Sequence, residues 1–119
     1  MNLTNNAGND LEAFLREKSK TTQKLNDALT NLTKLEISYE TKSNELWVTT
    51  NFSEVIVESR PTVDMKKAYI DNELKDIVSK IKIERNNVEV LKNDLKVTNA
   101  LIKAEEKYID VFCKITDAE

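Results

Sequence analysis

The side chains that could take part in catalysis are carboxylates and a single thiol, and neither set favours an enzyme. Pairs of carboxylates close in sequence, such as Glu105–Glu106 or Asp71–Glu73, could act as general acid and base, but this chemistry needs a cleft that raises the pKa of one member. Cys113 could act as a nucleophile, yet the chain contains no histidine to activate the thiol or to bind a metal ion. We interpret the carboxylates as solvated or interhelical charges, and we expect no enzymatic activity, no metal and no cofactor.

A set of lysines that recurs at a single heptad position could follow a phosphate backbone. Two acidic residues, Glu89 and Asp110, occupy the same heptad position, and no aromatic residues interleave with the lysines for base stacking. A solvated helix face is therefore the favoured interpretation, and contact with nucleic acid is the alternative. The lysines concerned are Lys75, Lys82, Lys96 and Lys103.

The composition requires a few long elements to position these side chains. The chain has 119 residues, enough for one domain, and it contains one glycine, Gly8, and one proline, Pro61. A fold with many sharp turns needs more of both residue types. One third of the residues are charged, as is typical of long solvent-exposed helices and not of a sandwich or a doubly wound sheet. We therefore expect an all-α fold.

Charge and cysteine content indicate a cytoplasmic protein. The 18 basic and 21 acidic residues give a net charge of −3 and are interleaved, so they create no strong field for nucleic acid or anionic lipid. No apolar run approaches the roughly 20 residues needed to span a bilayer, and the first ten residues lack the apolar core of a secretory signal. The single cysteine cannot form an intramolecular disulfide, which fits a reducing compartment. We expect no membrane partner.

A seven-residue repeat predicts a long first helix over residues 10–49. Asn9 and Glu12 are spaced as a capping box, so residues 1–9 are predicted to be a disordered leader. Lys18, Thr21 and Lys42 interrupt the repeat. The apolar seam consists of Leu11, Phe14, Leu25, Ala28, Leu32, Leu35, Tyr39 and Leu46.

The junction over residues 50–62 separates the two repeats. Asn51 and Glu54 could cap a short helical turn, which is the favoured interpretation, although the β-branched run 55–57 could instead be extended. Pro61 disfavours helix at the residue before it, and Thr62 is placed to cap the next helix. The aromatic residues around the junction either close the end of a helical hairpin or contact a partner; the two assigned to partner contact are Trp47 and Phe52.

The clearest pattern in the sequence predicts a second long helix over residues 63–115. Three polar residues, Glu84, Thr98 and Glu105, interrupt its seam, and a charged residue there either fixes the register or lies near water. Neither glycine nor proline interrupts the segment. The seam residues are Ile70, Leu74, Ile77, Ile81, Val88, Leu91, Leu95, Ile102, Ile109 and Phe112.

A second apolar stripe accompanies this seam and predicts self-association. The combined apolar arc is too wide for the narrow seam of the first helix to cover, and exposed apolar surface of this kind marks interfaces. We predict a long antiparallel hairpin, or coiled coil, that oligomerises into a helical bundle. The predicted oligomer interface consists of Ile83, Val90, Val97, Leu101, Ala104, Tyr108 and Val111.

The hairpin predicts a register between the two helices. Leu46 is expected to face Leu74, Tyr39 to face Ile81, and Leu25 to face Leu95. The alternative is a helix pair that splays at the proline and is satisfied by other protomers.

The junction also resembles a known group of proteins. The stretch 46–52, with sequence LWVTTNF, and the stretch 60–70, with sequence RPTVDMKKAYI, are similar to segments of small helical accessory proteins of tailed phages and prophages of Gram-positive bacteria. The resemblance covers about a quarter of the chain and brings no catalytic residues. It implies an accessory protein that works inside the host cell.

Taken with this resemblance, the sequence predicts a non-enzymatic coiled-coil protein, a scaffold or an inhibitor, that binds itself and a host or phage protein. The alternative is an accessory factor in phage DNA replication or recombination that contacts nucleic acid or a nucleic-acid enzyme.

Overall fold

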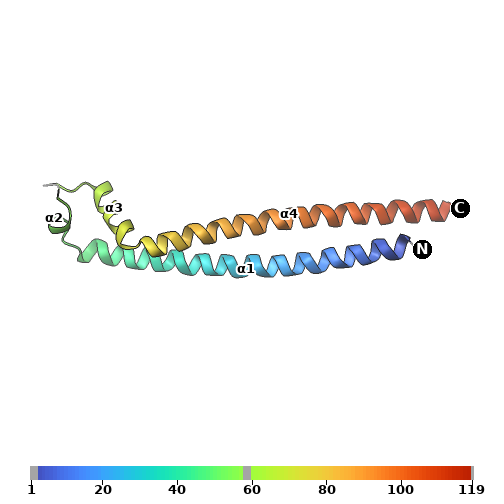
Figure 1. Cartoon of the computed structure of the whole chain (residues 1–119), viewed down its shortest axis with the longest axis horizontal. Helices are drawn as coiled ribbons and strands as arrows, with labels where there is room; N and C mark the ends of the chain where they lie inside the picture. The colour runs from blue at the N-terminus through green and yellow to red at the C-terminus, as the bar shows by residue number, and fades with distance from the viewer. Residues whose placement is uncertain (1–2, 58–59, 119) are drawn as a thin grey trace. The chain divides into compact units, whose positions relative to one another are not determined.

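Helices account for all the regular secondary structure in the residues that the computed structural model describes, 3–57 and 60–118 (Figure 1). They are α1 (Leu3–Thr49), α2 (Phe52–Val55), α3 (Val63–Glu73) and α4 (Lys75–Ala118). The predicted all-α helical hairpin is confirmed, because α1 and α4 pack against each other in opposite directions. Within the described ranges, no helix is long and apolar enough to cross a membrane.

The chain divides into two units, which we describe separately. The terminal unit contains residues 1–27 and 88–119, and the loop unit contains residues 28–87. In the terminal unit, the start of α1 lies beside the end of α4 (Figure 1). Thr21, Val88, Thr98 and Ile102 are buried in this contact, all at the predicted seam positions.

The loop unit contains the end of α1, all of α2 and α3, and the start of α4. Its core consists of Ala28, Phe52, Ile70 and Ile81, of which Ile70 is the most deeply buried at 2% exposure. Tyr39 and Ile81 line the same groove, in agreement with the predicted register. Across the two units, Lys18 and Lys42 are exposed, so the basic interruptions of the first seam stay in water.

Helix α1 begins earlier than the sequence pattern predicted. It starts at Leu3, so Asn9 lies within the helix and the predicted cap at Asn9 is wrong. No proline stops the helix before Asn9, and extending an existing helix adds one hydrogen bond for each residue fixed. The helix therefore includes Gly8 despite the low helix propensity of glycine. Residues 1 and 2 of the predicted leader lie outside the described residues.

The junction follows the favoured interpretation in part: α2 is the predicted short helical turn, but it ends at Val55, and Ile56 is extended with φ −110° and ψ 127°. Helix α2 begins after Asn51, although the Asn51 side chain makes no capping hydrogen bond. At the start of α3, the Oγ1 atom of Thr62 accepts a hydrogen bond from the Met65 N–H at 3.2 Å, which confirms the predicted cap. Asp64 in the first turn adds a negative charge where the helix dipole favours it.

The second predicted helix is divided at Leu74, which corrects the prediction of one continuous helix over 63–115. Leu74 has φ −102° and ψ 21°, and α3 runs at an angle to the start of α4 (Figure 1). The Leu74 N–H still donates to the Ile70 carbonyl at 2.9 Å, so this backbone hydrogen bond is kept at the bend. We attribute the bend to packing, because α3 carries Ile70 and Tyr69 to the core beside α2. Helix α4 ends at Ala118, three residues past the predicted end.

Candidate protein-interaction surfaces

The terminal unit carries exposed apolar residues along one face of α4, from residue 90 to residue 111, which we call the outer stripe. Each of its large residues keeps more than two fifths of its surface exposed, and Val97 is 61% exposed. The Tyr108 and Phe112 rings stack with centroids 6.5 Å apart and planes inclined by 20°. The outer stripe consists of Val90, Val97, Leu101, Ala104, Tyr108 and Val111.

The outer stripe is distinct from the contact with α1. Val88 and Ile102, which are buried in the hairpin, are two heptads apart on one face of α4. Val90 follows Val88 by two residues, and successive residues are about 100° apart around a helix, so Val90 lies about 200° around α4 from Val88. Val97 lies one heptad after Val90 and shares its face. The six residues of the outer stripe are the predicted interface residues of the terminal unit. The seventh, Ile83, belongs to the loop unit and is also exposed.

An aromatic cluster closes the loop unit. The Phe52 ring is 5.7 Å from the Trp47 ring and 6.1 Å from the Tyr69 ring, centroid to centroid. The Lys66 ammonium lies over both the Trp47 ring, at 5.8 Å, and the Phe52 ring, at 5.3 Å, in the geometry of a cation–π contact. Phe52 is only 8% exposed, whereas Trp47 is 40% exposed. Phe52 therefore occupies the position expected of a core cap, and Trp47 is the member of the cluster that a partner could reach.

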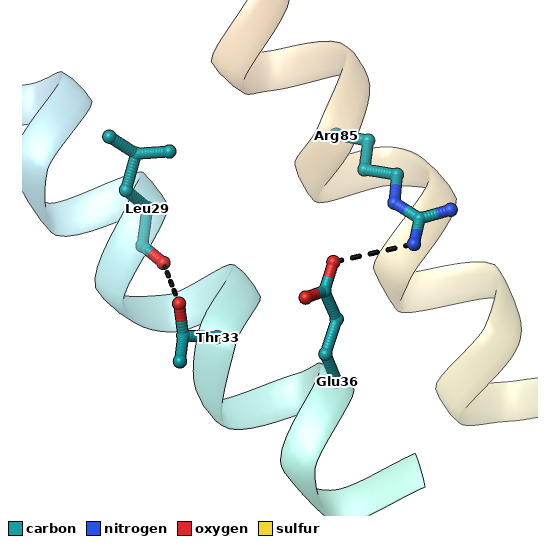
Figure 2. Close-up of polar contacts among 4 residues, drawn as sticks. All are labelled: Leu29, Thr33, Glu36 and Arg85. Atoms are coloured by element: carbon teal, nitrogen blue, oxygen red, sulfur yellow. Dashed lines mark hydrogen bonds and ion pairs between the residues drawn. The ribbon is translucent and has the colours of Figure 1, made fainter. Parts of the chain in front are cut away.

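Polar contacts join the helices of the loop unit around this core. The Arg85 guanidinium and the Glu36 carboxylate form an ion pair at 3.3 Å across α4 and α1 (Figure 2). Figure 2 also shows the Thr33 hydroxyl, which donates to the Leu29 carbonyl at 3.0 Å within α1. Arg85 and Glu36 lie on exposed surface, so the pair contributes about 0–1 kcal/mol to stability. It shows which faces of the two helices adjoin in the loop unit.

Glu84 is the charged interruption of the second seam in the loop unit, and it is half-buried. Its carboxylate accepts hydrogen bonds from the Asn31 amide at 3.1 Å and the Asn87 amide at 3.2 Å. Asn31 lies on α1 and Asn87 on α4, so Glu84 links the two helices. Of the two interpretations of Glu84, these contacts favour a role in fixing register.

Tyr39 on α1 donates a hydrogen bond to the Asp71 carboxylate on α3. This bond, followed by burial of the phenol and the negative charge of Asp71, raises the pKa of Tyr39 above 10.0, and a hydrogen bond with Ser43 opposes the shift. The heptad repeat predicted Tyr39 in the seam but did not indicate Asp71 as its partner. A tyrosine in a helix seam needs a polar partner for its hydroxyl, and this need was the one feature of the sequence that pointed to such a contact.

We expect the stabilisation by Tyr39 to depend on pH. The folded chain favours the protonated phenol, so the contribution is fully present below the unfolded pKa of about 10 and is lost as pH rises through the raised folded pKa. Tyr39→Phe should lower the free energy of unfolding by about 0.5–1.5 kcal/mol at neutral pH. Urea denaturation should show this difference shrinking above about pH 10. A difference that does not change with pH would contradict the assignment.

The lysines proposed for nucleic acid are all exposed, Lys75 and Lys82 in the loop unit and Lys96 and Lys103 in the terminal unit. Cys113 is exposed as well. Among the described residues, no group of three or more aspartate, glutamate, cysteine or histidine side chains could hold a metal ion.

The fold and these surfaces define an all-α helical hairpin with an exposed apolar stripe on its second long helix. No protein-family model, no curated protein and no solved structure matches the chain.

Proposed function

We propose that this chain is a non-enzymatic interaction protein that self-associates through the outer stripe and presents its assembled surface to another protein. One observation carries the proposal: in the terminal unit, α4 is covered by α1 on one face and carries exposed apolar side chains on another. Contiguous exposed apolar surface is characteristic of interfaces. A helix with two apolar faces needs two neighbours, and a second copy of the chain supplies the second.

The closed end of the loop unit is the candidate surface for a different protein. Trp47 is the half-exposed member of the aromatic cluster, and tryptophan is enriched at interaction hot spots. Through the resemblance of the junction, we propose an accessory protein of a phage of Gram-positive bacteria that acts in the host cytoplasm on a host or phage protein. Its role would be that of a scaffold or an inhibitor, since binding alone accomplishes either.

The alternative is an accessory factor in DNA replication or recombination. The exposure of Lys75, Lys82, Lys96 and Lys103 is the observation that favours it. Phosphate contacts by lysine release counterions, so such binding weakens steeply as salt rises.

Sedimentation at low and high salt distinguishes the two functions. An assembly held by the apolar outer stripe should keep its mass when salt is raised, since burial of apolar surface does not depend on screening. The DNA-binding alternative predicts salt-sensitive retention of DNA that is lost in Lys96→Glu/Lys103→Glu. A monomeric protein that retains DNA in this way would replace the proposed function with the alternative.

A further inference from the structure

We propose that two copies of the chain pair through the outer stripe with their α4 helices antiparallel. The inference rests on the proposed self-association and adds the partner, its direction and its register. Three observations carry it: the spacing of the outer stripe, the one charged residue that shares this spacing, and the position of the smallest residue of the stripe.

The spacing of the outer stripe fits a single neighbouring helix. With Asp94 included, its residues follow one another at intervals of four, three, four, three, four and three, from Val90 to Val111. Apolar residues that alternate at these intervals form the seam of a coiled coil, which one further helix covers. The stripe extends over about 32 Å of helix at 1.5 Å per residue. A second α4 offers a surface with the same spacing, and a two-fold axis would make the contact self-complementary.

Asp94 decides the direction of the partner helix. It is exposed and is the one charged residue among the seven seam positions from Val90 to Val111. In a parallel pair in register, Asp94 would face Asp94 of the partner subunit, which places two carboxylates together in an apolar seam. Like charges at facing positions destabilise a pair, and burial increases the penalty. An antiparallel pair separates the two carboxylates along the helix.

Ala104 indicates the register of the antiparallel pair. When Leu101 faces the partner's Val97, Tyr108 faces the partner's Val90 and Asp94 faces the partner's Ala104. Ala104 is the smallest residue of the outer stripe, so it leaves room for the Asp94 carboxylate to remain hydrated. The large apolar residues then pair with one another, as a packed seam requires.

Two single-cysteine variants, made in a Cys113→Ser background, test direction and register together. Val90→Cys and Tyr108→Cys face each other in the proposed pair, whereas two copies of Val90→Cys are 18 residues apart along the helix, or about 27 Å. A disulfide needs Cα atoms within about 7 Å. Oxidation should therefore yield crosslinked dimer when the two variants are mixed, and none when Val90→Cys is oxidised alone.

The remaining outcomes separate this inference from the proposed function. Crosslinking of Val90→Cys alone would show a parallel pair and overturn the inference. A protein with the mass of a dimer that crosslinks in neither sample would overturn the register, while leaving self-association in place. The last outcome is a mass of one chain for both the variant mixture and the wild-type protein. This result would overturn both the inference and the self-association on which it rests.

Discussion

Replacing Ile70 by alanine is expected to destabilise the fold by about 2–5 kcal/mol, the usual cost of removing a large side chain from a core. Ile70 is 2% exposed and lies on α3, immediately after Tyr69 of the aromatic cluster. Removing the side chain leaves a cavity where α3 packs in the loop unit. Urea denaturation followed by circular dichroism measures the change in the free energy of unfolding.

Ile37→Ala is the matched control for this prediction. Ile37 lies on α1 in the same unit and is 58% exposed, so the same substitution there should change stability by no more than about 0.5 kcal/mol. A similar loss of stability in both variants would show that the effect is not specific to the buried position of Ile70, since alanine has the higher helix propensity and cannot itself cause the loss. Little loss in Ile70→Ala would contradict the packed position of α3 and our explanation of the bend at Leu74.

Replacing Val97 by aspartate is expected to dissociate the assembly. Val97 lies in the middle of the outer stripe, and a symmetric pair would bury two new carboxylates without partners. A penalty of about 2–3 kcal/mol raises the dissociation constant roughly 30- to 140-fold. Sedimentation over a dilution series should show the shift to lower mass. Because Val97 lies outside the hairpin seam, the helix content of the variant should be retained.

Val48→Asp introduces the same charge at a position that the proposed interface does not use. Val48 is 82% exposed near the end of α1, in the loop unit. The mass of this variant should match that of the wild type over the same dilution series. If Val97→Asp also kept the wild-type mass, the outer stripe would not be the surface through which copies of this chain associate.

The parts of the fold that the sequence predicted are those set by periodicity. Ile81, Val88 and Ile102 recur at multiples of seven residues, and all three are buried. The cap at Thr62 was also predictable, since a threonine after a proline and before a helical pattern can satisfy a free N–H group locally. Such features depend on residues that are close along the chain or that share one helix face, and both relations can be read from a single sequence.

The features that were missed depend on contacts between distant residues. Leu74 is an ordinary helix-forming residue, and the bend there accompanies the packing of Ile70 on α3 rather than any local signal. Asp71 binds Tyr39 across 32 residues, and Glu84 binds Asn31 across 53. Many carboxylates and amides could have formed such pairs, so the sequence pattern could not select these.

The outer stripe lies between these two cases. Its residues were found from periodicity, and their exposure in the terminal unit is what such a second stripe predicts for a single copy of the chain. With α1 on one face and a second α4 on the other, α4 would become the central helix of a bundle.

The measurement that tests self-association most directly is the absolute molar mass of the protein in solution, by light scattering after size-exclusion chromatography. The sample should be reduced so that Cys113, which is exposed, cannot crosslink the chains. Self-association through the outer stripe predicts a mass of two or more chains of 13.7 kDa, with the antiparallel pair as the smallest assembly. A mass of one chain at concentrations well above the micromolar range would contradict self-association through the outer stripe.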